Sequence, residues 1–84
     1  MNHKFAPVYL WNSDGKQFAV SDVLRVAKWL TELWPAEYRG TDRHIEAMEI
    51  CLLELEGNAT PDDVRALFVE AAFEADLLAV DLLA

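Results

Sequence analysis

Cysteine and histidine are the side chains that could support nucleophilic chemistry, and the chain has one cysteine and two histidines. A cysteine nucleophile needs a base in hydrogen-bond contact with its sulfur. His44 and Cys51 are seven residues apart, which on one helix separates their Cα atoms by about 10 Å along the axis. This distance is too long for a catalytic pair. We therefore interpret Cys51 as a small core side chain and His44 as a capping or core-edge residue.

The spacing of other polar residues does not indicate a metal site. No His-x-x-x-His, Cys-x-x-Cys or calcium-loop pattern occurs. Glu46 and Glu49 would be neighbours on a helix, but no third ligand lies nearby. We expect the other histidine, His3, in a frayed terminus. The three glycines stand at turns or helix ends, so there is no phosphate-binding loop. The sequence thus predicts no catalytic residue, no metal and no cofactor, and we expect no enzymatic activity.

Aromatic residues offer one alternative, a small-molecule cleft. Trp11 could approach the first helix from a hairpin, and Trp29, Trp34, Tyr38 and His44 could line the cleft. Packing of the same side chains in the core is the simpler interpretation. Binding of a small ligand, or catalysis at this cleft, remains the weaker alternative.

Length and composition restrict the class of protein. A chain of 84 residues predicts one domain, covering residues 1–84. Its hydrophobic fraction of 54% is too high for a disordered chain. The sequence contains no run of about 18 apolar residues, so no membrane span is predicted. The start of the chain does not resemble a secretory signal. One cysteine cannot form an internal disulfide, so we expect a cytoplasmic protein.

Charge is distributed unevenly along the chain. Residues 1–43 contain six basic and five acidic side chains, whereas residues 44–84 contain one basic and ten acidic ones. The formal net charge of −8 disfavours binding to nucleic acid. The acidic half is either a solubilising surface or a patch that attracts a basic protein partner.

The first predicted element of secondary structure is a hairpin at about residues 7–20, which would position Trp11. Asn12-Ser13-Asp14-Gly15 is a strong turn sequence between two segments rich in aromatic and β-branched residues. A helix capped by Ser21 or Asp22 should follow over residues 22–34 and end before Pro35. The residues predicted to be buried on one arc of this helix are Val23, Val26, Ala27, Leu30, Leu33 and Trp34. Trp29 would lie at the border of the arc and be half exposed.

Two further helices are predicted over residues 42–56 and 61–75. Thr41 or Asp42 would cap the first of them, and Thr60 followed by Pro61 would begin the second. Residues 77–84 could continue as helix, or break near Asp76 into a short third strand. The predicted fold class is therefore α+β, with an N-terminal hairpin packed against three helices.

Apolar residues occur on both sides of the last two helices. The main face of residues 42–56 would be Ile45, Met48, Cys51, Leu52 and Leu55. The main face of residues 61–75 would be Val64, Leu67, Phe68, Ala71 and Ala75. A lone copy could not also cover the second stripe, Ile50, Leu53, Val69, Phe73 and Leu77. We therefore expect an interaction module that forms a homo-oligomer, most simply a dimer, through these two helices.

An ordered set of residues carries a family resemblance. The set is Trp34-Pro35, Gly40, His44, Ala47, Cys51-Leu52, Leu55-Glu56-Gly57, Pro61, Arg65-Ala66, Phe68 and Ala71-Ala72. From Pro7-Val8 to about Leu77 the chain resembles short rhizobial and other α-proteobacterial proteins grouped as domain of unknown function 982. The resemblance implies a small stand-alone α+β domain and brings no known activity, cofactor or catalytic residue. Asp76 replaces a helix-ending glycine of that family, and Phe73 replaces a polar residue.

Overall fold

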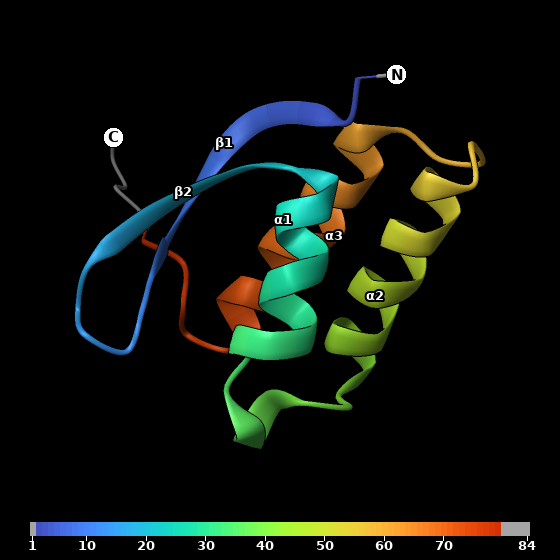
Figure 1. The fold of residues 1–84 in the computed structure, drawn as a ribbon. Helices are drawn as coiled ribbons and strands as arrows, with labels where there is room; N and C mark the ends of the chain where they lie inside the picture. Colours follow the sequence, from blue (N-terminus) through green and yellow to red (C-terminus); the bar gives the residue numbers. More distant parts are fainter. Residues whose placement is uncertain (1, 80–84) are drawn as a thin grey trace.

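The computed structural model describes residues 2–79 and has the predicted α+β fold (Figure 1). The hairpin lies beside α1, and α2 lies on the other side of α1. Along the chain, the elements are β1 (Lys4–Trp11), β2 (Gln17–Asp22), α1 (Val23–Lys28), the π-helix η1 (Trp29–Leu33), the 3-10 helix η2 (Ala36–Tyr38), α2 (Asp42–Leu55) and α3 (Pro61–Glu74). Within residues 2–79, no helix is long and apolar enough to cross a membrane.

The hairpin turn forms where the sequence predicts it. The side-chain oxygen of Asn12 accepts hydrogen bonds from the amides of Asp14 and Lys16, both at 2.9 Å. Gly15 has a φ of +78°, a conformation that side chains with a Cβ rarely adopt. The strands pair antiparallel with Val8 opposite Val20, and the register shifts between Lys4 and Val8. This local chemistry fixes the turn independently of the rest of the fold.

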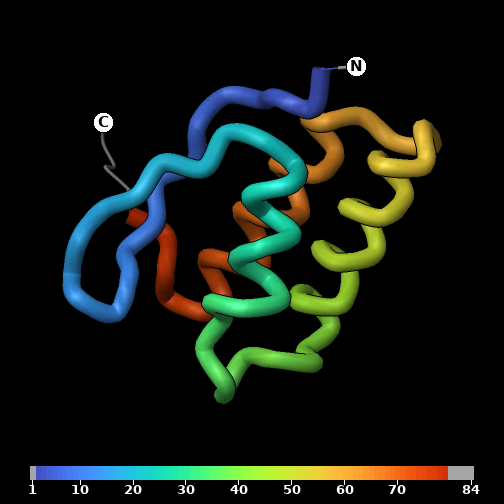
Figure 2. Tube along the Cα trace, viewed as in Figure 1, coloured from blue at the N-terminus to red at the C-terminus, as the bar shows by residue number. Residues whose placement is uncertain are grey.

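The segment after α3 returns to the hairpin and pairs with the free edge of β1 (Figure 2). The amide of Trp11 donates to the carbonyl of Leu77, and the amide of Ala79 donates to the carbonyl of Tyr9, both at 2.8 Å. Leu78 forms an antiparallel bridge with Leu10. The predicted break near Asp76 is thus present, but among the described residues the segment makes only an isolated bridge at Leu78 and the sheet has two strands. Residues 80–84 of the predicted tail lie outside the described residues.

Side-chain caps set the starts of the helices. Asp22 accepts from the amide of Arg25 at 2.8 Å and caps α1, and Thr41 caps α2. Thr60 and Asp63 form a reciprocal capping box at α3. Helix α3 ends at Glu74, and Asp76, two residues later, has a φ of +57° that stops the helix near the predicted position.

Helix α3 lies behind α1 and provides much of the core. Phe68 is completely buried, as are Val64, Ala71 and Ala72. These residues pack against the apolar side chains of β1, α1 and η1. The main face predicted for this helix is therefore correct, apart from the half-buried Leu67.

Two predictions for the first helix are wrong. Trp29, expected at a half-exposed border, is buried, and Leu33, expected in the buried arc, is 50% exposed. The cause is the π-helical turn of η1, which is wider than an α-helical turn and shifts the following residues around the axis. The core positions in this segment are Val23, Val26, Trp29, Leu30 and Trp34.

The face of α2 that points inward also differs from the prediction. Its buried residues are His44, Ala47, Cys51 and Glu54. Of the predicted main face only Cys51 is buried, while Ile45, Met48, Leu52 and Leu55 are exposed. Ile50, which was expected to point away, packs half-buried against the core. The inward face can include His44 and Glu54 because both find hydrogen-bond partners on other elements.

Candidate functional site

A groove of about 570 Å³ separates the tip of the hairpin from α1 and η1. Trp11 and Phe18 contribute exposed aromatic surface from the two strands, and Trp29 lines the groove from η1. Leu33 is exposed toward the groove as a result of the π-helical turn. A volume of this size and a predominantly apolar lining are typical of small-ligand sites.

The walls of this groove are tied together by backbone contacts. The Trp11–Leu77 hydrogen bond holds the C-terminal segment against the hairpin beside the groove. Pro35 and Asp76 also line the groove. The groove therefore depends on three segments that are distant in sequence, namely the hairpin, residues 25–35 and residues 76–77.

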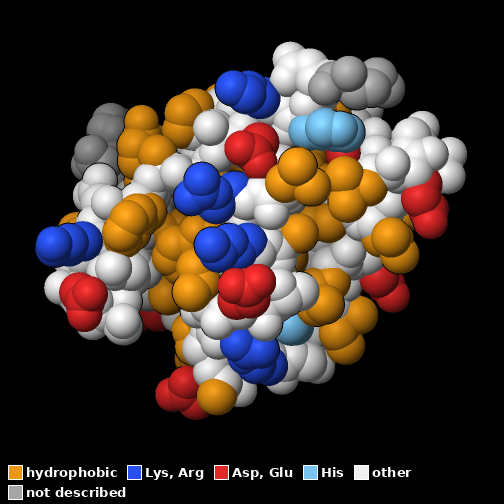
Figure 3. All heavy atoms as spheres, viewed as in Figure 1, with side chains coloured by type: hydrophobic (Ala, Val, Ile, Leu, Met, Phe, Trp, Pro, Cys, Tyr) orange, Lys and Arg blue, Asp and Glu red, His pale blue; other side chains and the backbone are white. Residues whose placement is uncertain are grey.

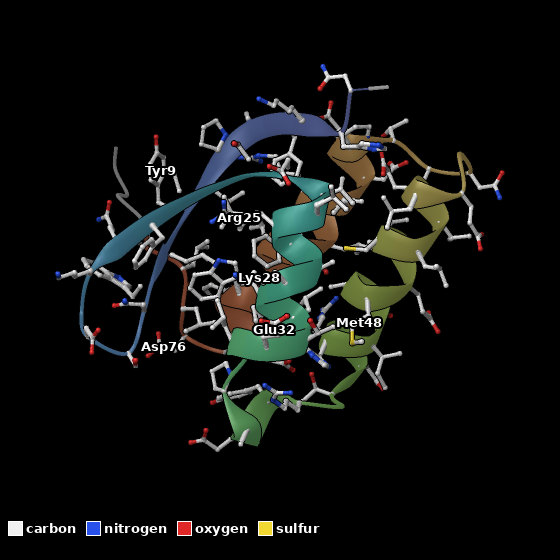
Figure 4. The ribbon with its side chains drawn as sticks, in the orientation of Figure 1. Tyr9, Arg25, Lys28, Glu32, Met48 and Asp76 are labelled. Carbon is white, nitrogen blue, oxygen red and sulfur yellow. The ribbon has the colours of Figure 1, made fainter. Side chains whose placement is uncertain are left out.

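Basic side chains stand at the rim of the groove. Figure 4 shows Arg25 and Lys28 extending from α1 on the hairpin side. Both are exposed, and neither forms an ion pair within residues 2–79. Figure 3 shows Lys and Arg side chains along this face of the molecule, with acidic side chains between them and apolar side chains on both sides. Of the charged residues that line the groove, two are basic and one, Asp76, is acidic.

The aromatic cluster that the sequence offered as a cleft is divided between two places. Trp29 lines the groove, but Trp34 and His44 are buried together, with ring centroids 5.9 Å apart. Tyr38 packs half-buried against the core. Trp11, which was expected to approach the first helix from the hairpin, also lines the groove. Trp34 and His44 thus have packing roles, as the simpler interpretation expected.

Both ring nitrogens of His44 are used in hydrogen bonds. The amide of Gly40 donates to Nδ1 at 3.1 Å, so Nδ1 carries no proton. The buried carbonyl of Leu30 lies 2.9 Å from Nε2 and accepts a hydrogen bond from its N–H. His44 therefore connects η1 to the start of α2 through both ring nitrogens, and neither is free to act as a base.

Cys51 is buried and is not arranged as a nucleophile. Burial, with a smaller contribution from the charge of Glu54, raises the pKa of its thiol to about 11. Glu54 is itself buried, and His3 bonds to both carboxylate oxygens at 2.9 Å. The prediction that His3 lies in a frayed terminus is therefore wrong. Within residues 2–79, no group of three or more His, Cys, Asp or Glu residues could hold a metal ion.

A second candidate site is the outward side of α2. Ile45, Met48, Leu52 and Leu55 are exposed along one side of this helix, and Leu24 on neighbouring α1 is exposed as well. Figure 4 labels Met48 on the near side of α2, and apolar side chains cover the corresponding part of Figure 3. We call the four α2 residues the outer stripe. Their spacing of three, four and three residues is that of one helix face.

The residues predicted to form an interface do not make one continuous patch. Ile50, Val69 and Leu77 pack half-buried against the core, whereas Leu53 and Phe73 are exposed. Because α2 and α3 are antiparallel neighbours, Leu53 lies close to the start of α3. Phe73 is twelve residues beyond Pro61, which is about 18 Å along that helix.

Of the two α2 residues expected in exposed apolar surface, Leu53 is exposed and Ile50 packs against the core. The outer stripe, which was expected to face inward, is exposed.

A cleft between the hairpin and the first helix was expected as an alternative, and Trp11 and Trp29 do line the groove, but Phe18, Arg25 and Lys28 were not assigned to it. Two features of the groove can be seen in the sequence, namely the turn at residues 12–15 and the basic pair Arg25 and Lys28. Nothing in the local pattern placed that pair opposite Phe18.

Comparison with known proteins gives one family. A family model described as "Protein of unknown function (DUF982)" matches residues 6–79. The search of curated proteins found no match, and neither did the search of solved structures. The family match agrees with the resemblance carried by the residues from Trp34-Pro35 to Ala71-Ala72.

Proposed function

Because the chain belongs to the DUF982 family, whose function is unknown, we propose its function from its own surface: a non-enzymatic interaction module that pairs with a second copy of itself. The contact surface in this proposal is the outer stripe of α2. The observation that carries the proposal is a row of four exposed apolar residues along one side of α2, next to the face that this helix buries in the core. Exposed apolar rows of this kind are typical of protein interfaces.

The spacing of the outer stripe suits pairing with itself. Its residues are symmetric about position 50, because Ile45 and Leu55 are equally distant from it, as are Met48 and Leu52. A two-fold axis at that level would place Ile45 of one copy opposite Leu55 of the other. It would likewise place Met48 opposite Leu52. A self-complementary surface is what a two-fold dimer requires.

The area is adequate for a small dimer interface. Four half-exposed large side chains, with Leu24 beside them, offer an apolar patch of roughly 400–500 Å² per copy. Standard interfaces bury about 800 Å² per partner, and somewhat more than half of that area is apolar. The polar flanks of α2 would supply the remainder.

Charge on those flanks should make the dimer weak and sensitive to salt. Glu49 and Glu56 are exposed on the same side of the outer stripe. A two-fold axis at position 50 would bring Glu49 near its own copy, which costs energy at low ionic strength, whereas the two copies of Glu56 would be about 18 Å apart along the helices. Added salt screens such repulsion over about 8–10 Å. Self-association should therefore strengthen as salt is added.

The same acidic flanks support a second candidate, an adaptor that binds a basic protein. Binding of that kind should weaken as salt is added, so the sign of the salt effect distinguishes the two candidates. The absence of catalysis is supported by the buried thiol of Cys51 and by the fully bonded ring of His44. A single buried cysteine also fits a reducing cytoplasm.

Analytical ultracentrifugation across micromolar to millimolar concentrations tests the proposal. The wild-type chain should dimerise, and Leu52→Glu should remain monomeric under the same conditions. Phe73→Glu is the matched control because it introduces the same charge at a side chain that is 73% exposed on α3. Both substitutions are at exposed helix positions, so circular dichroism should show the same fold for each.

The outcomes separate the alternatives. A wild-type chain that is monomeric at every concentration and salt level overturns self-association. Dissociation caused by Phe73→Glu but not by Leu52→Glu would place the contact on α3, near the surface that the sequence predicted. If the chain pairs with itself, the Glu49→Gln variant should dimerise more tightly than the wild type. If the chain binds a basic partner, the same variant should bind that partner more weakly.

A further inference from the structure

The groove between the hairpin and α1 combines two features that a binding site needs and that the proposed dimer does not use. Its lining is aromatic and apolar, with Trp11 42% and Phe18 45% exposed in the empty groove. Its rim carries the side chains of Arg25 and Lys28. The outer stripe lies on α2, across α1 from the hairpin, so this inference does not rest on the proposed function (Figure 1).

Arg25 differs from the other arginines of the chain. Each of the other three is held by its own protein: Arg39 donates to the carbonyl of Trp34, Arg43 pairs with Glu70, and Arg65 donates to the carbonyl of Ala6. The guanidinium of Arg25 forms no hydrogen bond or ion pair within residues 2–79. Its donors are therefore available to an external acceptor, and guanidinium binds carboxylates through two parallel hydrogen bonds.

Lys28 is available in the same way. It lies one turn along α1 from Arg25, on the groove side of the helix (Figure 4). Within the described part of the chain, neither of these two cations forms an ion pair, although the protein has a net charge of −8. Asp76 supplies one negative charge to the lining of the groove, so the lining has a net charge of +1.

We infer that this groove binds a small organic anion with a flat aromatic body. The aromatic body would lie against Trp11, Phe18 and Trp29, where burial of apolar area provides affinity. The anionic group, a carboxylate or a sulfonate, would lie at the rim with Arg25 and Lys28. The charges of the lining fix the orientation of the ligand, because its anionic group is attracted to Arg25 and Lys28 on α1 and repelled by Asp76.

Matched naphthalene probes test the charge requirement. The probes are 2-naphthoate, the neutral 2-naphthamide and the cationic 2-naphthylmethylammonium, which share one ring system and differ in charge. Calorimetric titrations of the wild-type chain should show the highest affinity for the anion, a lower affinity for the amide and the lowest for the cation. We expect the anion to bind about tenfold or more tightly than the amide.

The indole N–H resonances of the three tryptophans locate the bound probe. Those of Trp11 and Trp29 should shift on addition of 2-naphthoate in two-dimensional ¹⁵N NMR spectra. That of Trp34 should not, because this side chain is buried and does not line the groove. Trp11→Phe and Trp29→Phe variants assign the signals.

Substitutions at the rim complete the test. Arg25→Gln should reduce the affinity for 2-naphthoate by about tenfold and leave binding of 2-naphthamide within about twofold. Lys16→Gln is the control, since it removes the same charge from an exposed hairpin residue that does not line the groove.

Three results would overturn the inference. One is the absence of binding by all three probes at millimolar concentration. Another is equal affinity for the anion and the amide. The last is an equal loss of affinity in Arg25→Gln and Lys16→Gln, which would indicate a general effect of protein charge in place of a contact at the rim.

Discussion

Replacement of His44 tests how much the hydrogen bonds that join η1 to the start of α2 contribute to stability. His44→Leu keeps the size of the side chain approximately and removes both ring nitrogens. The buried carbonyl of Leu30 then loses its donor, and the amide of Gly40 loses its acceptor. We expect a clear loss of stability without a large change in the fold, because the core around Trp34 remains apolar.

The size of the effect follows from the two bonds and one ring contact. A buried carbonyl left without a partner costs about 1–3 kcal/mol. The amide of Gly40, on an exposed residue, can turn to water, so its loss costs about 0.5–1 kcal/mol. The aromatic contact with Trp34 adds about 0.5 kcal/mol. His44→Leu should therefore lower the free energy of unfolding by about 2–4 kcal/mol.

Urea unfolding followed by tryptophan fluorescence and circular dichroism measures this loss. With a denaturant slope of about 1 kcal/mol per molar urea, the midpoint should fall by about 2–4 M. His44→Gln retains a donor and an acceptor and should lose about half as much. A midpoint within about 0.5 M of wild type for His44→Leu would refute the reasoning.

A spectroscopic measurement on the wild type tests the same claim without relying on a variant. The ¹⁵N chemical shifts of His44 should report a neutral ring protonated on Nε2. Protonation on Nδ1 would contradict the hydrogen bond from Gly40.

Two further predictions concern the end of α3 and the buried thiol. Asp76→Gly should raise the melting temperature by about 3–8 °C, because Asp76 is in the left-handed region and its charge lies at a helix C-terminus. Asp76→Asn, which removes only the charge, should raise it less, and a lower melting temperature for both would contradict this account. Alkylation of Cys51 by iodoacetamide at pH 8 should be at least about 100-fold slower in the folded chain than in urea, because burial raises the pKa of the thiol from 9.0 to about 11. Equal rates, measured by mass spectrometry, would show that the thiol is accessible.

The positions where elements begin and end were predictable because the signals are local. Asn12 and Gly15 set the hairpin turn, and Thr60 with Pro61 set the start of α3. Each of these residues acts on backbone groups within four positions of itself. The α+β fold and the family resemblance were likewise correct at this level. The final segment remained ambiguous because a short apolar run fits helix or strand equally well.

The candidate sites were less predictable, because they depend on which surfaces cover each other. The π-helical turn at η1 exposed Leu33 to the groove and buried Trp29, although a regular helix predicts the reverse. Helical periodicity locates apolar residues on a face but does not state which face its neighbours will cover.

The sequence by itself determined the turn, the caps, the helix ends and the charge asymmetry, since each depends on residues close together in the chain. The tertiary structure decided the rotation of α2, which turned His44 and Glu54 inward and left Leu52 outside. It also brought Trp11 and Phe18 opposite Arg25 across one groove. The physical reason is that burial is a property of contacts between distant segments, and a polar side chain can be buried wherever another element supplies its partner.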